Sequence, residues 1–445
     1  MHYYCFIFSC FFLLISSASV ANQTANTKQA LYTQYSDTVE SYYREIAEAQ
    51  KKQIAKQDDI TKLKTYFVLL RNSGHEDTAI AALINHTSLI LDEIDSDSSL
   101  YLLDLLFSYN IKQSAFVIAQ YAIDNGSPFI ASNARYLLSL YYFKQNNFVK
   151  TFQNLSAIET SDALSPERRD YATLMFGIAL QKTKKHRQAI DIYQRVPIDS
   201  DYYIEAQLNM AVANIRQGWW TDAHIAVKNA IEHADTRDMK ESHNRSLMVL
   251  AYSQLQNEFY RNARNSFRAL SLDSAYVNQA LLGIGLCAMY QKDYNGALNA
   301  FSRLQKVDSD ELAVLESYLL LPYTYERMGE LDEASLLYSQ AIAYYGKKKL
   351  YLENQLAKQQ ATDFTISQQT LRQVSTGLME RYQRLLRLNT SARSSKLKKR
   401  IQSLTRTFEN TIISELNSQT EEKITKVQSY LSQTQYGLAK LYDNQ

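Results

Sequence analysis

The chain has 445 residues, of which 46% are hydrophobic and 21% are charged, and its net charge is only +2. This apolar content excludes an intrinsically disordered chain. Glycine (11 residues) and proline (4 residues) are too scarce for the many turns of a strand-rich or α/β fold. The composition therefore predicts an almost wholly helical protein.

Residues 1–21 have the pattern of a secretory signal peptide. An apolar run from Phe6 to Ile15 is followed by small residues, and cleavage after Ala21 would leave Asn22 first. The pattern predicts a periplasmic or secreted bacterial protein. Two alternatives stay open, because no lysine or arginine precedes the apolar run and because Cys10 follows a short apolar segment. They are an uncleaved N-terminal anchor and a lipidated N-terminus.

Residues 22–61 are predicted to form one leading helix, because apolar residues recur there at helical spacing. They are Tyr35, Val39, Tyr42, Ile46 and Ile54. From residue 62 onwards the pattern changes to shorter segments that predict helical hairpins. These hairpins are irregular at first, and they become clear from about residue 169.

A small-residue frame recurs at intervals of 34 to 40 residues. Its central positions are Ala189, Ala223, Ala263, Ala297 and Ala334. Four positions after each alanine stands a large residue, in order Tyr193, Val227, Phe267, Phe301 and Tyr338. A period near 34 with this small-to-large spacing is typical of stacked helical hairpins, in which the alanine lets two helices approach closely. Residues 62–345 are thus predicted to form an α-solenoid.

The array resembles the tetratricopeptide repeat (TPR) family over roughly residues 131–345. Phe176-Gly177 and Ile284-Gly285 match the Leu-Gly position of that family, and Tyr325 matches its tyrosine. The opening aromatic and the closing proline of the family pattern are absent, so the repeats are divergent. The resemblance implies an all-α solenoid that binds protein partners and performs no chemistry of its own.

The resemblance also implies that the first helix of each hairpin lines a concave face. The residues carried over to that face are nearly all apolar, and they predict a groove for a partner's helix or peptide. They are Leu208, Val212, Ile215, Met248, Tyr252, Leu255, Leu282, Leu286, Met289, Leu319 and Tyr323. Because an open groove of this composition would expose a large apolar patch, we expect something to fill it. The chain's own tail is one candidate, and tight winding that buries these residues against neighbouring repeats is the alternative.

Residues 350–445 are predicted to form long amphipathic helices, either a helical hairpin or a coiled coil. Their basic residues are concentrated in a patch of eight. These are Arg381, Arg384, Arg387, Arg393, Lys396, Lys398, Lys399 and Arg400. The patch is either a solvated helix face or a docking surface for the acidic array, an acidic partner or anionic lipid headgroups.

The sequence lacks the usual patterns of catalysis and of cofactor or metal binding. The six histidines outside the predicted signal, His75, His86, His186, His224, His233 and His243, are scattered without ligand spacing. Cys287 is the one cysteine outside the signal, and its apolar surroundings predict a buried thiol. Trp219-Trp220 has the form of a sugar platform, but Trp220 occupies the aromatic slot of its repeat, which favours packing, and the role of Trp219 stays open.

These patterns favour a non-enzymatic interaction scaffold or assembly factor of the bacterial cell envelope, without a cofactor or a metal. Its partner would be another protein or its own C-terminal helices, with an anionic membrane surface as a further possibility and nucleic acid excluded by export. Two other functions stay open. One is a structural spacer that oligomerises through the C-terminal helices, and the other is a small-ligand sensor or enzyme that uses the groove as its pocket.

Overall fold

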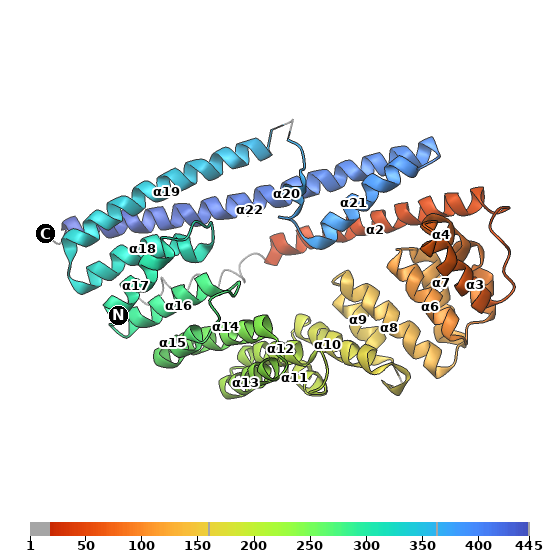
Figure 1. Cartoon of the computed structure of the whole chain (residues 1–445), viewed down its shortest axis with the longest axis horizontal. Coiled ribbons are helices and arrows are strands. Elements are labelled where there is room, and N and C mark those ends of the chain that lie inside the picture. Colours follow the sequence, from red (N-terminus) through yellow and green to blue (C-terminus); the bar gives the residue numbers. More distant parts are fainter. Residues whose placement is uncertain (1–17, 159–160, 362–363, 444–445) are drawn as a thin grey trace. The chain divides into compact units, whose positions relative to one another are not determined.

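The computed structural model describes residues 18–158, 161–361 and 364–443 (Figure 1). The described residues form helices and connecting turns without a β-strand, which confirms the predicted all-α class. Residues 1–17, which hold most of the predicted export signal, lie outside the described part. The chain divides into two compact units. Each combines one continuous array of helices with a later segment from the C-terminal tail.

Unit 1 comprises the residues up to Ser165 together with 366–414. Its helices in the first segment are α2 (Ala18–Ala49), α3 (Ile60–Asn72), α4 (Glu76–Asn85), α5 (Thr87–Asp92), α6 (Asp97–Ser108), α7 (Lys112–Asn125), α8 (Pro128–Lys144), α9 (Phe148–Ser156) and the 3₁₀ turn η1 (Ser161–Ala163). The second segment adds α20 (Gln368–Leu371), α21 (Thr376–Ser391) and the beginning of α22 (Ser395–Asp443).

Unit 2 comprises residues 166–365 and 415–445. It contains five helical hairpins and the end of α22. The hairpins are α10 (Pro166–Lys182) with α11 (His186–Tyr193), α12 (Tyr203–Arg216) with α13 (Trp220–Thr236), α14 (Lys240–Gln256) with α15 (Tyr260–Arg268), α16 (Val277–Tyr290) with α17 (Tyr294–Leu304), and α18 (Leu312–Met328) with α19 (Leu331–Gln359). This arrangement is the predicted α-solenoid with divergent TPR-like repeats.

The leading helix is shorter than the 22–61 expected from the sequence. Helix α2 ends at Ala49, and Ile54 is buried in the connection that follows. Asp59 then starts a new helix, because its side chain accepts hydrogen bonds from the amides of Thr61 and Lys62 at 2.8 and 2.9 Å. The apolar spacing continues past Ala49, but it does not reveal that Asp59 caps a separate helix, α3.

The predicted alanine frame forms the core of unit 2. All five alanines are at most 1% exposed, and the large residues four positions later are at most 2% exposed. The aromatic rings at these positions pack directly on glycines: Tyr193 on Gly177, Phe267 on Gly283 and Phe301 on Gly285. A Cβ atom at any of these glycines would overlap the ring. Small residues on one helix therefore set how closely a ring of the other can approach.

The end of α22 takes the place of a sixth hairpin's first helix in unit 2. It runs antiparallel to α19, so that Tyr345 stacks on Tyr430 and Tyr338 lies against Gly437 (Figure 1). Phe267 packs in the same way on Gly283, which belongs to the first helix of the following hairpin. The last hairpin thus has a covering helix, as a solenoid end requires for solubility.

The C-terminal tail was expected to be one region, residues 350–445. The structure instead continues α19 to Gln359 as part of the last hairpin, and it assigns 366–414 to unit 1 and 415–445 to unit 2. The reason is that the tail's apolar faces are buried by residues far away in the sequence. A local hydrophobic period reports that a face is buried, but it does not identify what buries it.

We expect Gly285→Ala to lower the stability of unit 2 by about 1–3 kcal/mol, because the new methyl group must displace the Phe301 ring. The matched control is Gly346→Ala in α19, where no atom lies within 4 Å of the added Cβ. This substitution should stabilise the helix by about 0.5–1 kcal/mol. Urea unfolding followed by circular dichroism measures both, and equal effects of the two substitutions would contradict the packing described here.

Candidate functional site

The predicted groove residues are mostly enclosed by the hairpins themselves. Five of them, Leu208, Met248, Leu282, Leu286 and Met289, are buried, and Ile215, Tyr252, Leu255, Leu319 and Tyr323 are partly buried. Of the eleven, Val212 alone is exposed, at 40%. The groove is therefore not an open apolar channel along its length.

Two kinds of contact cover this face in unit 2. Leu282, Leu286 and Met289 pack in one cluster with residues of α18, so consecutive first helices bury each other. Leu319 packs beside Val427 and Leu441 of α22. Neighbouring repeats thus bury one part of this face, and the chain's own tail buries another part. That these residues bind a partner stays a prediction.

An exposed row of large apolar side chains lies instead along the turns that join the two helices of each hairpin in unit 2. We call Trp219, Phe259, Tyr290 and Met328 the turn edge. They are 38%, 55%, 38% and 37% exposed, and they come from four successive hairpins. Because all hairpins run in the same order, these turns follow one another along one edge of the stack.

Contacts between neighbouring turns hold two members of this row, Trp219 and Tyr290, in place. The guanidinium of Arg187 lies over the Trp219 ring, 5.4 Å from its centroid, and its Nε donates to Gln217. One hairpin further along, Tyr260 stacks on Tyr290 with centroids 4.8 Å apart. The rings of Trp219 and Tyr290 are therefore positioned by neighbouring side chains. The sequence singled out Trp219, but it gave no sign of the others, because their positions flank the repeat frame and do not belong to it.

The last hairpin of unit 2 holds α22 by specific polar contacts as well as by apolar packing. Lys440 Nζ lies 2.6 Å from Glu326 Oε1, and the Tyr338 hydroxyl donates to the other oxygen of Glu326 at 2.8 Å. Tyr430 makes a hydrogen bond with Glu316. Contacts of this kind fix the register of the helix, which apolar packing alone leaves free.

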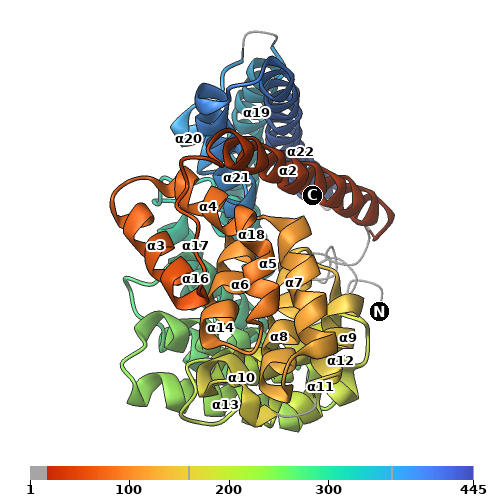
Figure 2. The same ribbon diagram turned by 90° about the vertical axis from the view of Figure 1, so that its right-hand side faces the viewer.

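The predicted basic patch divides into two groups in unit 1. Arg381, Arg384 and Arg400 contact side chains of α2, which lies beside α21 (Figure 2). The remaining five, Arg387, Arg393, Lys396, Lys398 and Lys399, are exposed. Helix α2, with its tyrosines and serine, is thus a docking partner of the first group.

Arg384 has the most enclosed position in the patch. Its Nη2 donates to the Tyr43 hydroxyl at 3.0 Å, and the guanidinium faces the Tyr43 and Tyr109 rings at 5.8 and 5.7 Å. Burial and a hydrogen bond to Glu76 raise the pKa of Tyr109 to about 12. Burial also raises the pKa of Tyr43, although Arg384 opposes that rise. Neutral phenols therefore hold this cation, through ring faces and a hydroxyl.

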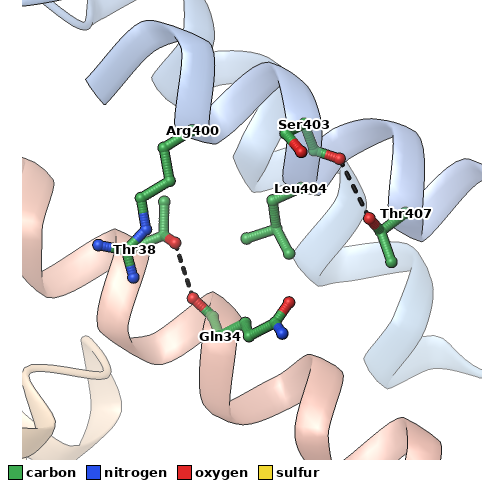
Figure 3. A pocket seen from close by; sticks show the side chains of 6 residues that line it. All are labelled: Gln34, Thr38, Arg400, Ser403, Leu404 and Thr407. Carbon is green, nitrogen blue, oxygen red and sulfur yellow. Dashed lines mark hydrogen bonds between the residues drawn. The ribbon is translucent and has the colours of Figure 1, made fainter. Parts of the chain in front are cut away.

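A shallow cavity of about 320 Å³ lies between α2 and α22 in unit 1 (Figure 3). It is lined by Gln34, Thr38, Arg400, Ser403, Leu404 and Thr407. The two threonine hydroxyls are already used, since they donate to the carbonyls of Gln34 and Ser403. Arg400 donates to Ser41. The cavity therefore offers few free polar groups that converge on one point.

The described residues carry no arrangement for chemistry. They contain no group of three or more histidine, cysteine or acidic side chains that could hold a metal, and none of their helices is long and apolar enough to cross a membrane. Cys287 is buried, as predicted, and burial raises the pKa of its thiol to about 12. His86 is used structurally, since its ring nitrogens contact the Ala82 carbonyl and the Gln57 amide.

No protein-family model and no curated protein matches the sequence. Among solved structures, the apo form of RapI aligns with 79% of this chain and 98% of its own, at 12% identity and a TM-score of 0.46. A signal transduction ATPase with a TPR sensor from Pyrococcus horikoshii aligns with 70% and 54%, at 12% identity and 0.41. A TPR protein from Parabacteroides merdae aligns with 62% and 98%, at 14% identity and 0.37. These likenesses concern the helical-repeat fold alone.

We expect Arg384→Gln to loosen α21 from α2, because the tyrosine rings and hydroxyl lose their cation. The expected loss is about 1–3 kcal/mol, the usual cost of breaking a buried hydrogen bond to a charged group. Hydrogen exchange of residues 376–391 measures it. The control Lys398→Gln changes an exposed member of the same patch and should stay within about 0.5 kcal/mol. Equal protection in both variants would contradict a docking role for Arg384.

Proposed function

We propose that this chain is a non-enzymatic protein–protein interaction scaffold of the bacterial envelope, and that the turn edge of unit 2 binds its partner. One observation carries the proposal: Trp219, Phe259, Tyr290 and Met328 are exposed at equivalent ends of four successive hairpins. Single exposed apolar residues are ordinary on protein surfaces. A row of them that comes from the same turn of four successive hairpins is a better match to an extended partner segment.

The chemistry of the row suits a protein partner. Tryptophan, tyrosine, phenylalanine and methionine are enriched at interfaces, and aromatic residues most often dominate their energetics. The Arg187–Trp219 and Tyr260–Tyr290 contacts hold side chains in place before binding, so less entropy is lost when a partner arrives. Packed helices lie about 8–10 Å apart, which sets the spacing of successive anchors in the partner.

The structure disfavours the alternative of a coiled-coil spacer. In the tail, Phe408 packs against Tyr35 of α2, while Val427 and Leu441 pack against the last hairpin. The apolar stripe that a dimeric coiled coil would need is thus already covered by the same chain. A sensor or enzyme finds little support either, since the predicted groove is closed by packing.

Photo-crosslinking tests the turn edge. A crosslinking amino acid at Phe259 should capture one defined protein from the native envelope, and Trp219→Glu in the same chain should reduce the yield at least tenfold. The matched control is Ile225 in α13, which is 52% exposed but lies outside the row. Products of the same mass and yield from Phe259 and Ile225 would overturn the proposal.

The envelope location rests on the apolar run from Phe6 to Ile15 and on the small residues that follow it. We expect the protein purified from its own cells to begin at Asn22. Mass spectrometry of the N-terminal peptide checks this and separates the alternatives: a chain beginning at Met1 fits an anchor, and a lipid-modified Cys10 fits a lipoprotein. Recovery of the unprocessed chain from the cytosol would contradict export.

A further inference from the structure

The contact between α22 and the last hairpin of unit 2 encloses an acid that has no basic partner. Glu316 lies in α18 and is partly buried, and the groups that face it are Tyr430 on α22 and Tyr345 on α19. Tyr345 donates its hydroxyl to the Leu315 carbonyl at 2.7 Å, which leaves Tyr430 to hydrogen-bond Glu316. An acid in such a place costs free energy when it ionises.

The charged groups of the surrounding helices are engaged elsewhere or are exposed. Lys348 pairs with Asp310, Lys349 with Glu353, Lys426 with Glu422 and Lys440 with Glu326. Arg327 hydrogen-bonds Tyr294 and Tyr323. Lys347, Lys423, Arg303 at the end of α17 and Lys306 just after it are exposed. None of these cations acts on Glu316 strongly enough to offset its burial.

The helix that covers Glu316 is held to the hairpin by its side chains. It packs through one face, with Val427, Tyr430 and Leu441 on α18 and α19, and its backbone hydrogen bonds are internal. Separation would return Glu316 to water and would uncover Leu319, the groove residue beneath it. Ionisation of Glu316 would bias the equilibrium between the docked and the separated helix.

We propose that Glu316 makes the docking of residues 415–443 on the α18–α19 hairpin pH-dependent, so that docking is tight in acid and weak in neutral and alkaline medium. The inference goes beyond the proposed function, because it concerns this chain's own helix and needs no partner at the turn edge. Its biological consequence would be an apolar helix-binding face at the last hairpin that becomes available in neutral or alkaline medium.

The direction follows from the two protonation equilibria. Burial raises the pKa of Glu316 to about 7 in the docked state, with Tyr430 opposing part of the rise, whereas an exposed glutamate has 4.5. Below 4.5 the carboxyl is neutral in both states and docking is strongest. Between 4.5 and 7 the undocked state releases its proton first, so docking weakens, and above 7 it levels off. The difference corresponds to a change on the order of a hundredfold in the docking equilibrium.

Hydrogen exchange of the full-length protein tests this, with the exchange times scaled for the intrinsic pH dependence. Peptides from residues 415–443 should lose protection by between tenfold and a hundredfold from pH 5.5 to pH 8.0, while α14 keeps its protection. Glu316→Gln keeps the shape and a hydrogen-bond acceptor for Tyr430 without a charge. It should remain protected at both pH values.

Two further variants define the limits. Gly437→Val puts a branched side chain against the Tyr338 ring, so residues 415–443 should be unprotected at both pH values and report the detached state. Tyr430→Phe removes the hydrogen bond that lowers the pKa of Glu316, and its loss of protection should be larger at pH 8.0. The proposal is overturned if the unmodified protein is equally protected at both pH values, or if Glu316→Gln loses protection as much as the unmodified protein does.

Discussion

The close approach of an aromatic ring to a glycine or alanine is the contact on which unit 2 depends. Tyr193, Phe267 and Phe301 each lie on a glycine of a neighbouring helix, and the frame alanines are at most 1% exposed. These contacts fix helix distances within a hairpin, at Tyr193 and Phe301, and between successive hairpins, at Phe267. Close packing buries much of the helix faces. The turns at the ends of the hairpins therefore contribute to the exposed surface of the array as much as the helix faces do.

The same contact explains why the tail is part of the fold and not an appendage. Tyr338 occupies the aromatic position of the last hairpin, and without α22 its ring would face water. Gly437 supplies the small residue that the next hairpin would have supplied. The Lys440–Glu326 pair and the Tyr430–Glu316 hydrogen bond then select one register among those that a smooth apolar stripe would allow. Burial under α22 also disfavours the ionised form of Glu316.

The sequence alone was sufficient for the helical class, the hairpin period and the buried alanine frame, because all three are local patterns of small and large residues. It was insufficient where a contact joins distant segments. Arg384 and Tyr43 are 341 residues apart, and Lys440 and Glu326 are 114 apart. No period in the chain connects such pairs, so the basic patch was read as one surface although the structure splits it. The groove was similarly read from helix faces, whose burial depends on how tightly successive hairpins pack.

Helix α22 contributes to both compact units, and its two parts are held by different chemistry. The residues up to 414 are secured on α2 by ring contacts such as Phe408 with Tyr35 and by hydrogen bonds such as Arg400 with Ser41. The residues from 415 onward are held by apolar packing, by the Lys440–Glu326 pair and by the Tyr430–Glu316 hydrogen bond. Because protonation of Glu316 acts on the second set alone, the end of α22 can leave its hairpin while the beginning keeps its contacts. A helix attached at one end and released at the other stays at high local concentration, so recapture is fast and the switch is reversible.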